Sequence, residues 1–331
     1  MKKLINDAVN YVDEVLDGLC LAHPEVFAID GATGRMLRKK SSGKNNVGVV
    51  SGGGFGHLPI FAGYVGEGLL DACAVGDVFA SPDMNPMLEA IQFADKGHGV
   101  VCVVGNYGGD KMNFAMACEM AEMEDIAAHQ VIVCDDVASA PLDEAEKRRG
   151  VAGLVYVMKI AGAASAADMS LEDVVAVTER AAANCRSIGV ALGSCVVPQA
   201  GKPTFEIADG EMEIGMGIHG EPGVSRGKLK SADALVAELL EFVMPELSLS
   251  AGDKVSILVN GLGATPNEEL YILFRAAQAI LKDKGIELVR PLVGNYATSM
   301  EMAGASITVM KLDEELEGLL SAPANNPFWR N

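Results

Sequence analysis

Positive charge is scarce in this chain of 331 residues. Lys and Arg number 26 against 45 Asp and Glu, which leaves a formal net charge of −19 and a pI near 4.6. Proteins that bind nucleic acids usually concentrate Lys and Arg on one face. The nearest basic run, from Lys147 to Arg149, is more simply a solvated helix end. We therefore expect no nucleic-acid partner.

Cysteine pairs and long apolar runs are also missing. The seven cysteines lie mostly in apolar or small-residue segments and none has CxxC spacing, so a reduced cytoplasm fits better than a disulfide framework or a zinc site. No stretch reaches the roughly 20 apolar residues of a membrane span. Acidic residues interrupt the N-terminal MKKLINDAVNYVDEVL where a signal peptide would be apolar. We expect a cytoplasmic protein without a membrane partner.

The common nucleotide and metal motifs do not occur. No GxxxxGKS/T loop is present, and GGGFG at 52–56 does not match GxGxxG followed by an acidic residue about 20 positions later. HExxH is absent as well. The sequence thus predicts no metal site and no nucleotide site of a familiar type.

Apolar runs alternate with helical patterns in the first half of the chain. Strands are predicted for VGVV (47–50), ACAVGDVF (72–79), GVVCVVGNY (99–107) and HQVIVCDDV (129–137). Helix-forming segments lie between them at 87–96 and 113–124. Strands separated by helices imply parallel βαβ units. An amphipathic helix from Ile5 to about His23 is expected before them.

The second half becomes richer in strands after two helical segments, 150–167 and 170–189. Strands are expected over 187–197, 202–208, 211–218, 254–263 and 287–296, with a helix over 269–285. The simplest interpretation is two α/β domains, residues 1–183 and 184–331. Each would have a largely parallel or mixed sheet flanked by helices, and no low-complexity linker separates them.

Glycine-rich loops follow several of the predicted strands and carry polar residues. SGGGFGH ends at His57, NYGGD ends at Asp110, and His219 lies within GMGIHGEPGV. In parallel α/β sheets, ligands bind beyond the carboxyl ends of the strands. An Asp and two His can supply a general base, an orienting donor and a nucleophile for one small substrate.

Each of these residues also has a structural interpretation. Asp110 can cap the helix that follows it, His57 can be a hydrogen-bonded loop residue, and His219 can bond across a turn. A shared metal is disfavoured, because the three residues lie in separate segments without a ligand motif. Spacing alone leaves the structural and the functional interpretations open.

A set of segments, in order along the chain, carries a resemblance to a known family. The segments are MKKLIND, SGGGFGH with AGYVG after it, GDVFASP, NYGGDKMNF, RRGVAG, SIGVALGSC, MGIHGEPG and NGLGATP. Through them the chain resembles the substrate-binding subunit of dihydroxyacetone kinase, DhaK, over essentially its whole length. The resemblance implies a homodimer of two-domain α/β subunits that takes part in ketose phosphorylation.

The resemblance also implies roles for the three polar residues. His219 would attack the ketone carbon of dihydroxyacetone through Nε2 and form a hemiaminal, which glycerol cannot do because it has no carbonyl; a neutral imidazole is a competent nucleophile near pH 7. Asp110 would accept the proton of the hydroxyl that receives the phosphoryl group, and His57 would orient or deprotonate the substrate. The implied substrate-binding residues are Gly53, Gly54, Gly56, His57, Gly105, Asp110 and His219.

By the same resemblance, the nucleotide is held elsewhere. A DhaL subunit or a fused C-terminal domain carries ATP or ADP with magnesium in this family, so we expect no cofactor on this chain and no transfer without a partner. The donor is either ATP directly or a relay through a DhaM-type phosphotransferase protein. The chain does not decide between them.

The sequence departs from better-known members near the implied site. Leu58 replaces a carboxylate beside His57, Phe55 and Phe61 add bulk, and Gly105 stands where those members have lysine. Without that lysine the pocket loses a cation and gains room. We therefore hypothesise a substrate larger than dihydroxyacetone, such as the four-carbon ketose erythrulose.

A ketose sensor is the alternative function. Some DhaK-like proteins keep the hemiaminal histidine but coactivate a transcription regulator without catalysis. His219 serves both functions, whereas a sensor has no need of a base at Asp110. The intact NYGGDKMNF segment therefore favours the kinase.

Overall fold

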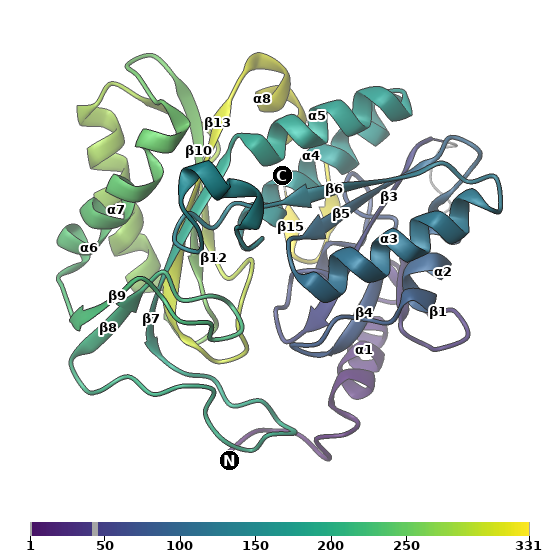
Figure 1. Ribbon diagram of the computed structural model, residues 1–331, viewed down its shortest axis with the longest axis horizontal. Coiled ribbons are helices and arrows are strands. Elements are labelled where there is room, and N and C mark those ends of the chain that lie inside the picture. The colour runs from purple at the N-terminus through teal and green to yellow at the C-terminus, as the bar shows by residue number, and fades with distance from the viewer. Residues whose placement is uncertain (1, 42–45, 331) are drawn as a thin grey trace.

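The computed structural model describes residues 2–41 and 46–330. Two mixed β-sheets with helices packed against them confirm the predicted α/β class (Figure 1). The predicted division into 1–183 and 184–331 falls between α5 (Leu171–Ala183) and β7 (Cys185–Gly193). It stays a prediction, although the strands of the two sheets lie on opposite sides of it in the sequence.

The first sheet consists mainly of the predicted βαβ units. Across the sheet, its strands are β1 (Phe27–Asp30), β2 (Met36–Lys39), β4 (Ala72–Val78), β3 (Gly48–Phe55), β5 (Val100–Gly105) and β6 (Ala128–Val133). The strands β4, β3, β5 and β6 run parallel, and β1 and β2 add an antiparallel edge. The parallel strands are apolar and largely buried because helices cover both of their faces.

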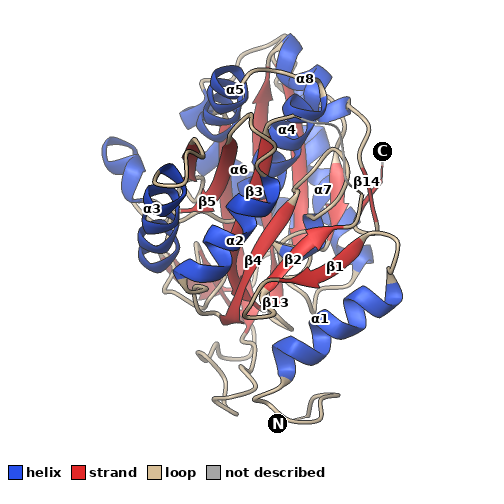
Figure 2. Cartoon of the chain, turned by 90° about the vertical axis from the view of Figure 1, so that its right-hand side faces the viewer, coloured by secondary structure: helices blue, strands red, loops and turns tan. Residues whose placement is uncertain are grey.

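Five helices pack on this sheet. On one face lie α2 (Met84–Ala94) and α3 (Gly108–Glu122); on the other lie α1 (Tyr11–Ala22), α4 (Gly153–Ala166) and α5. Figure 2 shows α3 at one margin of the molecule and α1 beside β1 at the opposite margin. The helix α4 contacts both sheets, so it is buried on every side and its sequence is mostly apolar. Its one charged residue, Lys159, donates a hydrogen bond of 2.8 Å to the carbonyl of Leu319.

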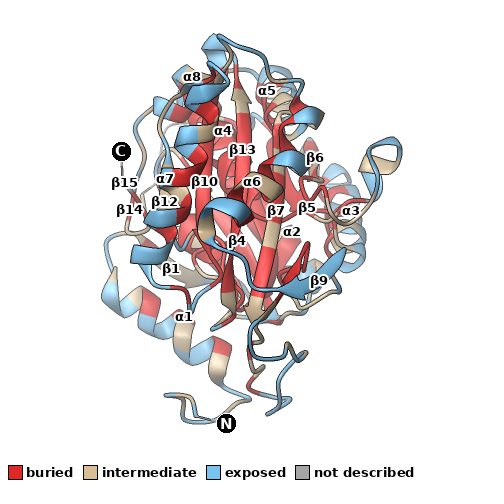
Figure 3. Cartoon of the chain, turned by 90° about the vertical axis from the view of Figure 1, so that its left-hand side faces the viewer, coloured by how far each residue is buried: buried red, intermediate tan, exposed pale blue. Residues whose placement is uncertain are grey.

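The second sheet is mostly antiparallel. Its strands are β11 (Glu287–Leu288), β10 (Lys254–Gly261), β13 (Ala303–Leu312), β7, β8 (Glu211–Ile214) and β9 (Ser225–Lys228), with β12 (Leu292–Gly294) also paired to β10. One face is covered by α6 (Ala232–Val243) and α7 (Asn267–Asp283), and α4 packs on the other. Figure 3 shows the resulting buried centre, in which β10 and β13 are almost wholly enclosed and β7 is partly buried.

The end of the chain returns to the first half. Beyond β13, the remaining elements are α8 (Glu314–Ser321) and the hairpin of β14 (Asn325–Asn326) and β15 (Trp329–Arg330). Three short 3-10 helices complete the described structure: η1 (Ala62–Tyr64), η2 (Leu142–Lys147) and η3 (Pro245–Leu247). The side chain of Asn326 donates a hydrogen bond of 3.2 Å to the carbonyl of Val65 and so fixes the hairpin beside η1. No helix within 2–41 and 46–330 has the length and apolar character of a bilayer-crossing segment.

The first helix is shorter than predicted. It begins at Tyr11 instead of near Ile5. The Asp7 side chain accepts a hydrogen bond of 3.0 Å from the backbone N–H of Val9, which fixes a turn ahead of the helix. The apolar residues before Tyr11 therefore continue the helical spacing without continuing the helix, and Val9 is 76% exposed.

Two predicted strands of the second half are also wrong in detail. Residues 202–208 form a loop with only an isolated bridge between Val196 and Pro203, consistent with a proline that has no N–H to donate to a ladder. The predicted strand 287–296 is divided into β11 and β12 around Arg290, whose φ of 46° lies outside the range of extended backbone.

Candidate functional site

Adjacent parallel strands bring the first part of the site together. His57 follows β3, Phe79 follows β4, and Tyr107 and Asp110 follow β5. These strands are neighbours in the order β4, β3, β5, so the loops at their carboxyl ends gather at one edge of the sheet. The structure thus places His57 and Asp110 at the edge where their glycine-rich loops predicted a ligand.

His57 is almost fully buried, with 1% of its surface exposed. Its Nδ1 lies 2.7 Å from the carbonyl oxygen of Thr298. A carbonyl only accepts, so Nδ1 carries the proton and Nε2 keeps a free lone pair. Burial, followed by the charge of His219, lowers the pKa of His57 to about 3. Nε2 is buried without a partner within the described ranges, which suits it to accept a hydrogen bond from a ligand hydroxyl.

His219 comes from the second sheet, in the loop between β8 and β9. Its Nδ1 lies 2.9 Å from Oε1 of Glu221, whose Oε2 accepts a hydrogen bond of 3.0 Å from the His219 backbone N–H. Burial opposes ionisation of Glu221, but hydrogen bonding and charge from His219 outweigh it and lower the carboxyl pKa to about 2. The carboxylate therefore holds the imidazole proton on Nδ1 and leaves the lone pair on Nε2.

Four rings meet where the loops of the two sheets converge. The centroid of the His219 ring lies 4.8 Å from that of His57, 4.8 Å from that of Tyr107 and 5.2 Å from that of Phe79. In each case the rings meet edge to face. Phe79 stacks on His57 at 4.9 Å with an interplanar angle of 18°. The two histidines predicted from separate segments thus belong to one site.

Asp110 is the third residue of α3, and the N-cap is Tyr107, so the interpretation of Asp110 as the helix cap is wrong. The aspartate is 6% exposed, and Ser81 Oγ donates a hydrogen bond of 2.5 Å to its Oδ1. Burial raises the pKa of Asp110 to about 6, while the Ser81 bond and the charge of His219 partly offset the rise. Such a carboxylate is ionised at pH 7 and still basic enough to accept a proton.

Arg149 lies beside the part of the site that contains His219 and Glu221. Its guanidinium donates hydrogen bonds of 2.8 Å to Oδ2 of Asp136 and to the carbonyl of Gly215, and Nη1 lies 4.0 Å from Oε2 of Glu221. The fixed cation favours the ionised form of Glu221. The sequence interpretation of Lys147 to Arg149 as a solvated helix end is wrong for Arg149, whose side chain is only 13% exposed. Glu221 was not identified individually from the sequence. The one available signal was an acid two residues after the histidine in IHGEPG.

Packing explains the glycines that follow Ser51. A Cβ on Gly53 would lie 2.2 Å from the Phe61 ring, and one on Gly54 would lie 2.8 Å from the backbone nitrogen of Ala80. Gly56 has a φ of 101°, which other residues rarely adopt. These glycines let neighbouring loops approach the strand end that carries the histidine. Their contact with substrate stays a prediction.

The departures from the family pattern fall in two places. Phe55 and Phe61 lie in the hydrophobic core, 4% and 6% exposed. At Gly105, by contrast, a Cβ would stand 3.4 Å from the side chains of Leu154 and Tyr107, an ordinary contact distance. The hydroxyl of Tyr107 is buried without a hydrogen-bond partner in the part of the chain described. The contact of Gly105 with substrate stays a prediction.

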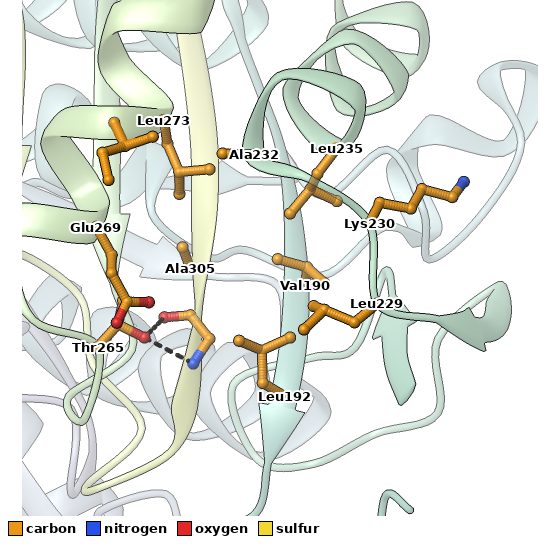
Figure 4. A pocket seen from close by; sticks show the side chains of 12 residues that line it. Val190, Leu192, Leu229, Lys230, Ala232, Leu235, Thr265, Glu269, Leu273 and Ala305 are labelled. Atoms are coloured by element: carbon orange, nitrogen blue, oxygen red, sulfur yellow. Dashed lines mark hydrogen bonds between the residues drawn. The ribbon is translucent and has the colours of Figure 1, made fainter. Parts of the chain in front are cut away.

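A separate apolar cleft of about 210 Å³ lies on the second sheet beside α6 and α7 (Figure 4). Leucine side chains and Val190 dominate its lining, and the Thr265 hydroxyl is bonded to the backbone of Gly304. None of the predicted site residues lines it. The described residues contain no group of three or more His, Cys, Asp or Glu side chains placed to hold a metal ion.

The Dak1 domain model matches residues 17–328. The chain is 44% identical to the "PTS-dependent dihydroxyacetone kinase 1, dihydroxyacetone-binding subunit DhaK" of Listeria innocua, over 99% of this chain and 100% of that protein. It is 40% identical to the "D-erythrulose kinase" of Mycolicibacterium smegmatis, over 100% of this chain and 57% of that longer protein.

Solved structures agree with the sequence matches. The dihydroxyacetone kinase of C. freundii superposes with a TM-score of 0.91 at 33% identity, covering 99% of this chain and 60% of that one. The dihydroxyacetone kinase operon co-activator DhaQ gives a TM-score of 0.88 at 30% identity, covering 94% of this chain and 96% of that one. With a family match along nearly its whole length, the chain belongs to the Dak1 domain family and, within it, to the DhaK subunits of dihydroxyacetone kinases.

Proposed function

We propose that this protein is the substrate-binding subunit of a ketose kinase. It carries a short ketose covalently on His219 and presents one hydroxyl for phosphorylation by a nucleotide-bearing DhaL-type partner. The observation that carries the proposal is the pairing of the imidazole with Glu221, 2.9 Å from Nδ1, which directs the reactive lone pair to Nε2. The named relatives, which include a dihydroxyacetone-binding subunit and an erythrulose kinase, support the ketose class.

The covalent step is an addition to the ketone. The lone pair of His219 Nε2 forms a bond to the carbonyl carbon, the C=O π pair moves to oxygen, and that oxygen takes a proton from water. No water is lost. The imidazole, now bonded at Nε2 and protonated at Nδ1, carries positive charge. The carboxylate of Glu221 stabilises that charge through a charge-assisted hydrogen bond.

The other polar groups act on the hydroxyls. His57 Nε2 accepts a hydrogen bond from one hydroxyl and fixes the ketose chain, since its own Nδ1 is occupied by Thr298. Asp110 takes the proton of the hydroxyl that attacks the phosphoryl group. Phosphoryl transfer depends mainly on positioning and charge stabilisation, so holding one hydroxyl in line is this subunit's contribution.

The phosphoryl donor lies on the partner in this proposal. ATP or ADP with magnesium would be bound by the DhaL-type subunit. The PTS-dependent relatives favour a relay through a DhaM-type phosphotransferase protein that recharges the nucleotide there. The homodimer and the cytoplasmic location inferred from the sequence stay predictions.

The loss of the family's lysine at Gly105 and the relative named as an erythrulose kinase support a ketose longer than dihydroxyacetone. The Tyr107 ring lies beside Gly105, and the buried Tyr107 hydroxyl has no hydrogen-bond partner among the described residues. In this proposal the phenol receives the additional hydroxyl of erythrulose. Turnover of the two ketoses with the cognate partner tests the idea. A tenfold or greater preference for dihydroxyacetone would contradict it.

Native mass spectrometry tests the proposed function directly. The protein is incubated with dihydroxyacetone and, separately, with erythrulose. We expect a gain of one ketose mass without loss of water, which separates a hemiaminal from an imine. Absence of a gain with either ketose would overturn the covalent site. A gain without phosphoryl transfer to any DhaL-type subunit would instead support the sensor, a possibility raised by the DhaQ likeness.

Replacing Glu221 with Gln is expected to weaken ketose binding about tenfold, or about 1.4 kcal/mol. A neutral amide accepts a hydrogen bond but does not stabilise the charged, alkylated imidazole. Calorimetric titration with the ketose gives the affinity, and kcat at saturating ketose should change by less than about threefold, because Glu221 acts through His219. Glu206→Gln, in the exposed loop nearby, is the control. An unchanged ketose affinity in the Glu221 variant would contradict the proposal that Glu221 stabilises the charged imidazole.

Transfer should fall in acid with an apparent pKa near 6. The raised pKa of Asp110, about 6, means that the base is a carboxylate above this pH and protonated, hence inactive, below it. The measurement is kcat against pH at saturating ketose and partner, so that loss of adduct formation does not contribute. His57 does not titrate in this range, since its pKa is about 3. A flat profile down to about pH 5 would rule out Asp110 as the base.

A further inference from the structure

The outer face of α3 carries a row of exposed methionines. Met112, Met116, Met120 and Met123 are 61%, 46%, 39% and 79% exposed. Their spacing of four, four and three residues puts them on one side of a helix. We call this set the methionine face. The opposite side of α3, which includes Phe114, packs on the first sheet.

A surface helix normally turns charged or polar residues to solvent. On the outer side of α3, four exposed methionines lie among only two exposed charged residues, Glu119 and Glu122. Figures 1 and 2 show α3 on the outside of the first sheet, with α2 beside it and no element covering its outer side. Methionine is enriched at protein interfaces, where its flexible thioether adapts to a partner surface. The face is therefore suited to a protein partner.

The methionine face is continuous with the candidate site. The first turn of α3 consists of Gly108 and Gly109, both exposed, and Asp110, the proposed base. A Cβ on Gly108 would meet nothing within 4 Å. The turn that holds the proposed base therefore exposes bare backbone, and the first methionine follows two residues after Asp110.

We propose that the methionine face is the docking surface for the nucleotide-carrying donor subunit. The inference rests on the proposed function, since it assumes that a separate protein brings the phosphoryl group to Asp110. At 1.5 Å of rise per residue, Met112, Met116 and Met120 lie roughly 3, 9 and 15 Å along the helix from the base. A stable interface covers about 800 Å² on each partner, a patch about 16 Å in radius. A donor centred over Asp110 therefore covers these three methionines.

The chemistry of the face also indicates the character of the donor's surface. The chain as a whole carries a net charge of −19, and the exposed charged residues among the methionines, Glu119 and Glu122, are acidic as well. We expect a complementary apolar patch on the donor, with cations opposite Glu119 and Glu122. A second copy of this chain seated on α3 would block the approach to Asp110, and so is incompatible with transfer.

The double variant Met112→Gln with Met116→Gln tests the proposal. The matched control is Tyr271→Gln with Ile272→Gln, two exposed apolar residues on α7 at 59% and 49% exposure. The probe is the ADP-loaded DhaL-type subunit that supports transfer by the wild-type chain. We expect its dissociation constant, from biolayer interferometry, to rise tenfold or more for the methionine variant only. The half-saturating donor concentration in the transfer assay should rise in parallel, with kcat within twofold.

The outcomes separate failure of the inference from failure of the function. Unchanged donor affinity in the methionine variant, with the ketose adduct and transfer intact, overturns the docking surface alone. The methionine variant could also sediment as a monomer where the wild-type chain sediments as a dimer, with donor affinity unchanged. That result overturns the docking surface and assigns the methionine face to a second copy of the chain. Absence of adduct and of transfer in the wild-type chain overturns the proposed function, and the inference with it.

Discussion

Replacing His219 with Ala is expected to abolish the ketose adduct and to reduce phosphoryl transfer by at least about 10²-fold. The methyl side chain has no nucleophile, so no hemiaminal forms and the ketose is held only by hydrogen bonds. The anchored hydroxyl loses its fixed position, and displacements on the order of 1 Å are enough to cost about this factor. Native mass spectrometry with the ketose and a coupled transfer assay give the two readouts.

The fold should survive this change. The His219 side chain is 23% exposed and lies in a loop, so its truncation leaves no closed cavity in either sheet. A melting temperature within a few degrees of wild type is expected by circular dichroism. His129→Ala, an exposed histidine on β6, should leave the adduct unchanged. An adduct that persists in the His219 variant would place the nucleophile elsewhere.

The parallel part of the first sheet was predictable because few topologies fit its pattern. Apolar runs of strand length, separated by helical segments, imply parallel neighbours. A glycine-rich loop with a polar residue after such a strand then locates that residue at the carboxyl edge, as for His57 and Asp110. The approach of His219 to that edge depends on how the second sheet packs across α4. Spacing along the chain carries no measure of that packing.

Other features depend on contacts that no local pattern encodes. The strand β13 was not anticipated because Ser306 and Thr308 interrupt its apolar residues. In the structure both hydroxyls are buried and satisfied: Ser306 accepts from Asn260 Nδ2 at 3.1 Å, and Thr308 Oγ1 pairs with Ser187 Oγ at 2.6 Å. The strand is enclosed on both faces, so it also lacks the alternation of a half-exposed strand. Its identity follows from partners on β10 and β7.

The same limit applies within the site. Glu221 was recognisable as an acid near His219, but its role comes from a turn that brings Oε1 to Nδ1 and Oε2 to the backbone N–H. Phe79 adopts a φ of 58°, which is rare for an aromatic residue, and stacks on His57. A sequence pattern specifies neither conformation. The quoted motifs identified His219 and His57, but not the residues that contact their rings, Glu221 and Phe79.

Replacing Asp110 with Asn should separate binding from catalysis. Asn has nearly the same shape and its Oδ1 can still accept the Ser81 hydroxyl, so the loop keeps its geometry. The adduct on His219 should form with wild-type affinity, because Asp110 takes no part in the addition. Transfer should fall by about 10² to 10⁴-fold, the usual contribution of a general base. Adduct mass and kcat are measured on the same preparation.

Ser81→Ala is the control for this experiment. It removes the hydrogen bond to Asp110 but leaves the carboxylate, so the loss in kcat should be modest, within about tenfold. That bond lowers the pKa of Asp110, so its removal should shift the acid limb of the kcat profile to higher pH. Full transfer by the Asn variant would contradict the assignment of the base. A ketose sensor would bind equally well with Asp or Asn at position 110, so a kcat lost with the adduct retained is the result that separates the kinase from the sensor.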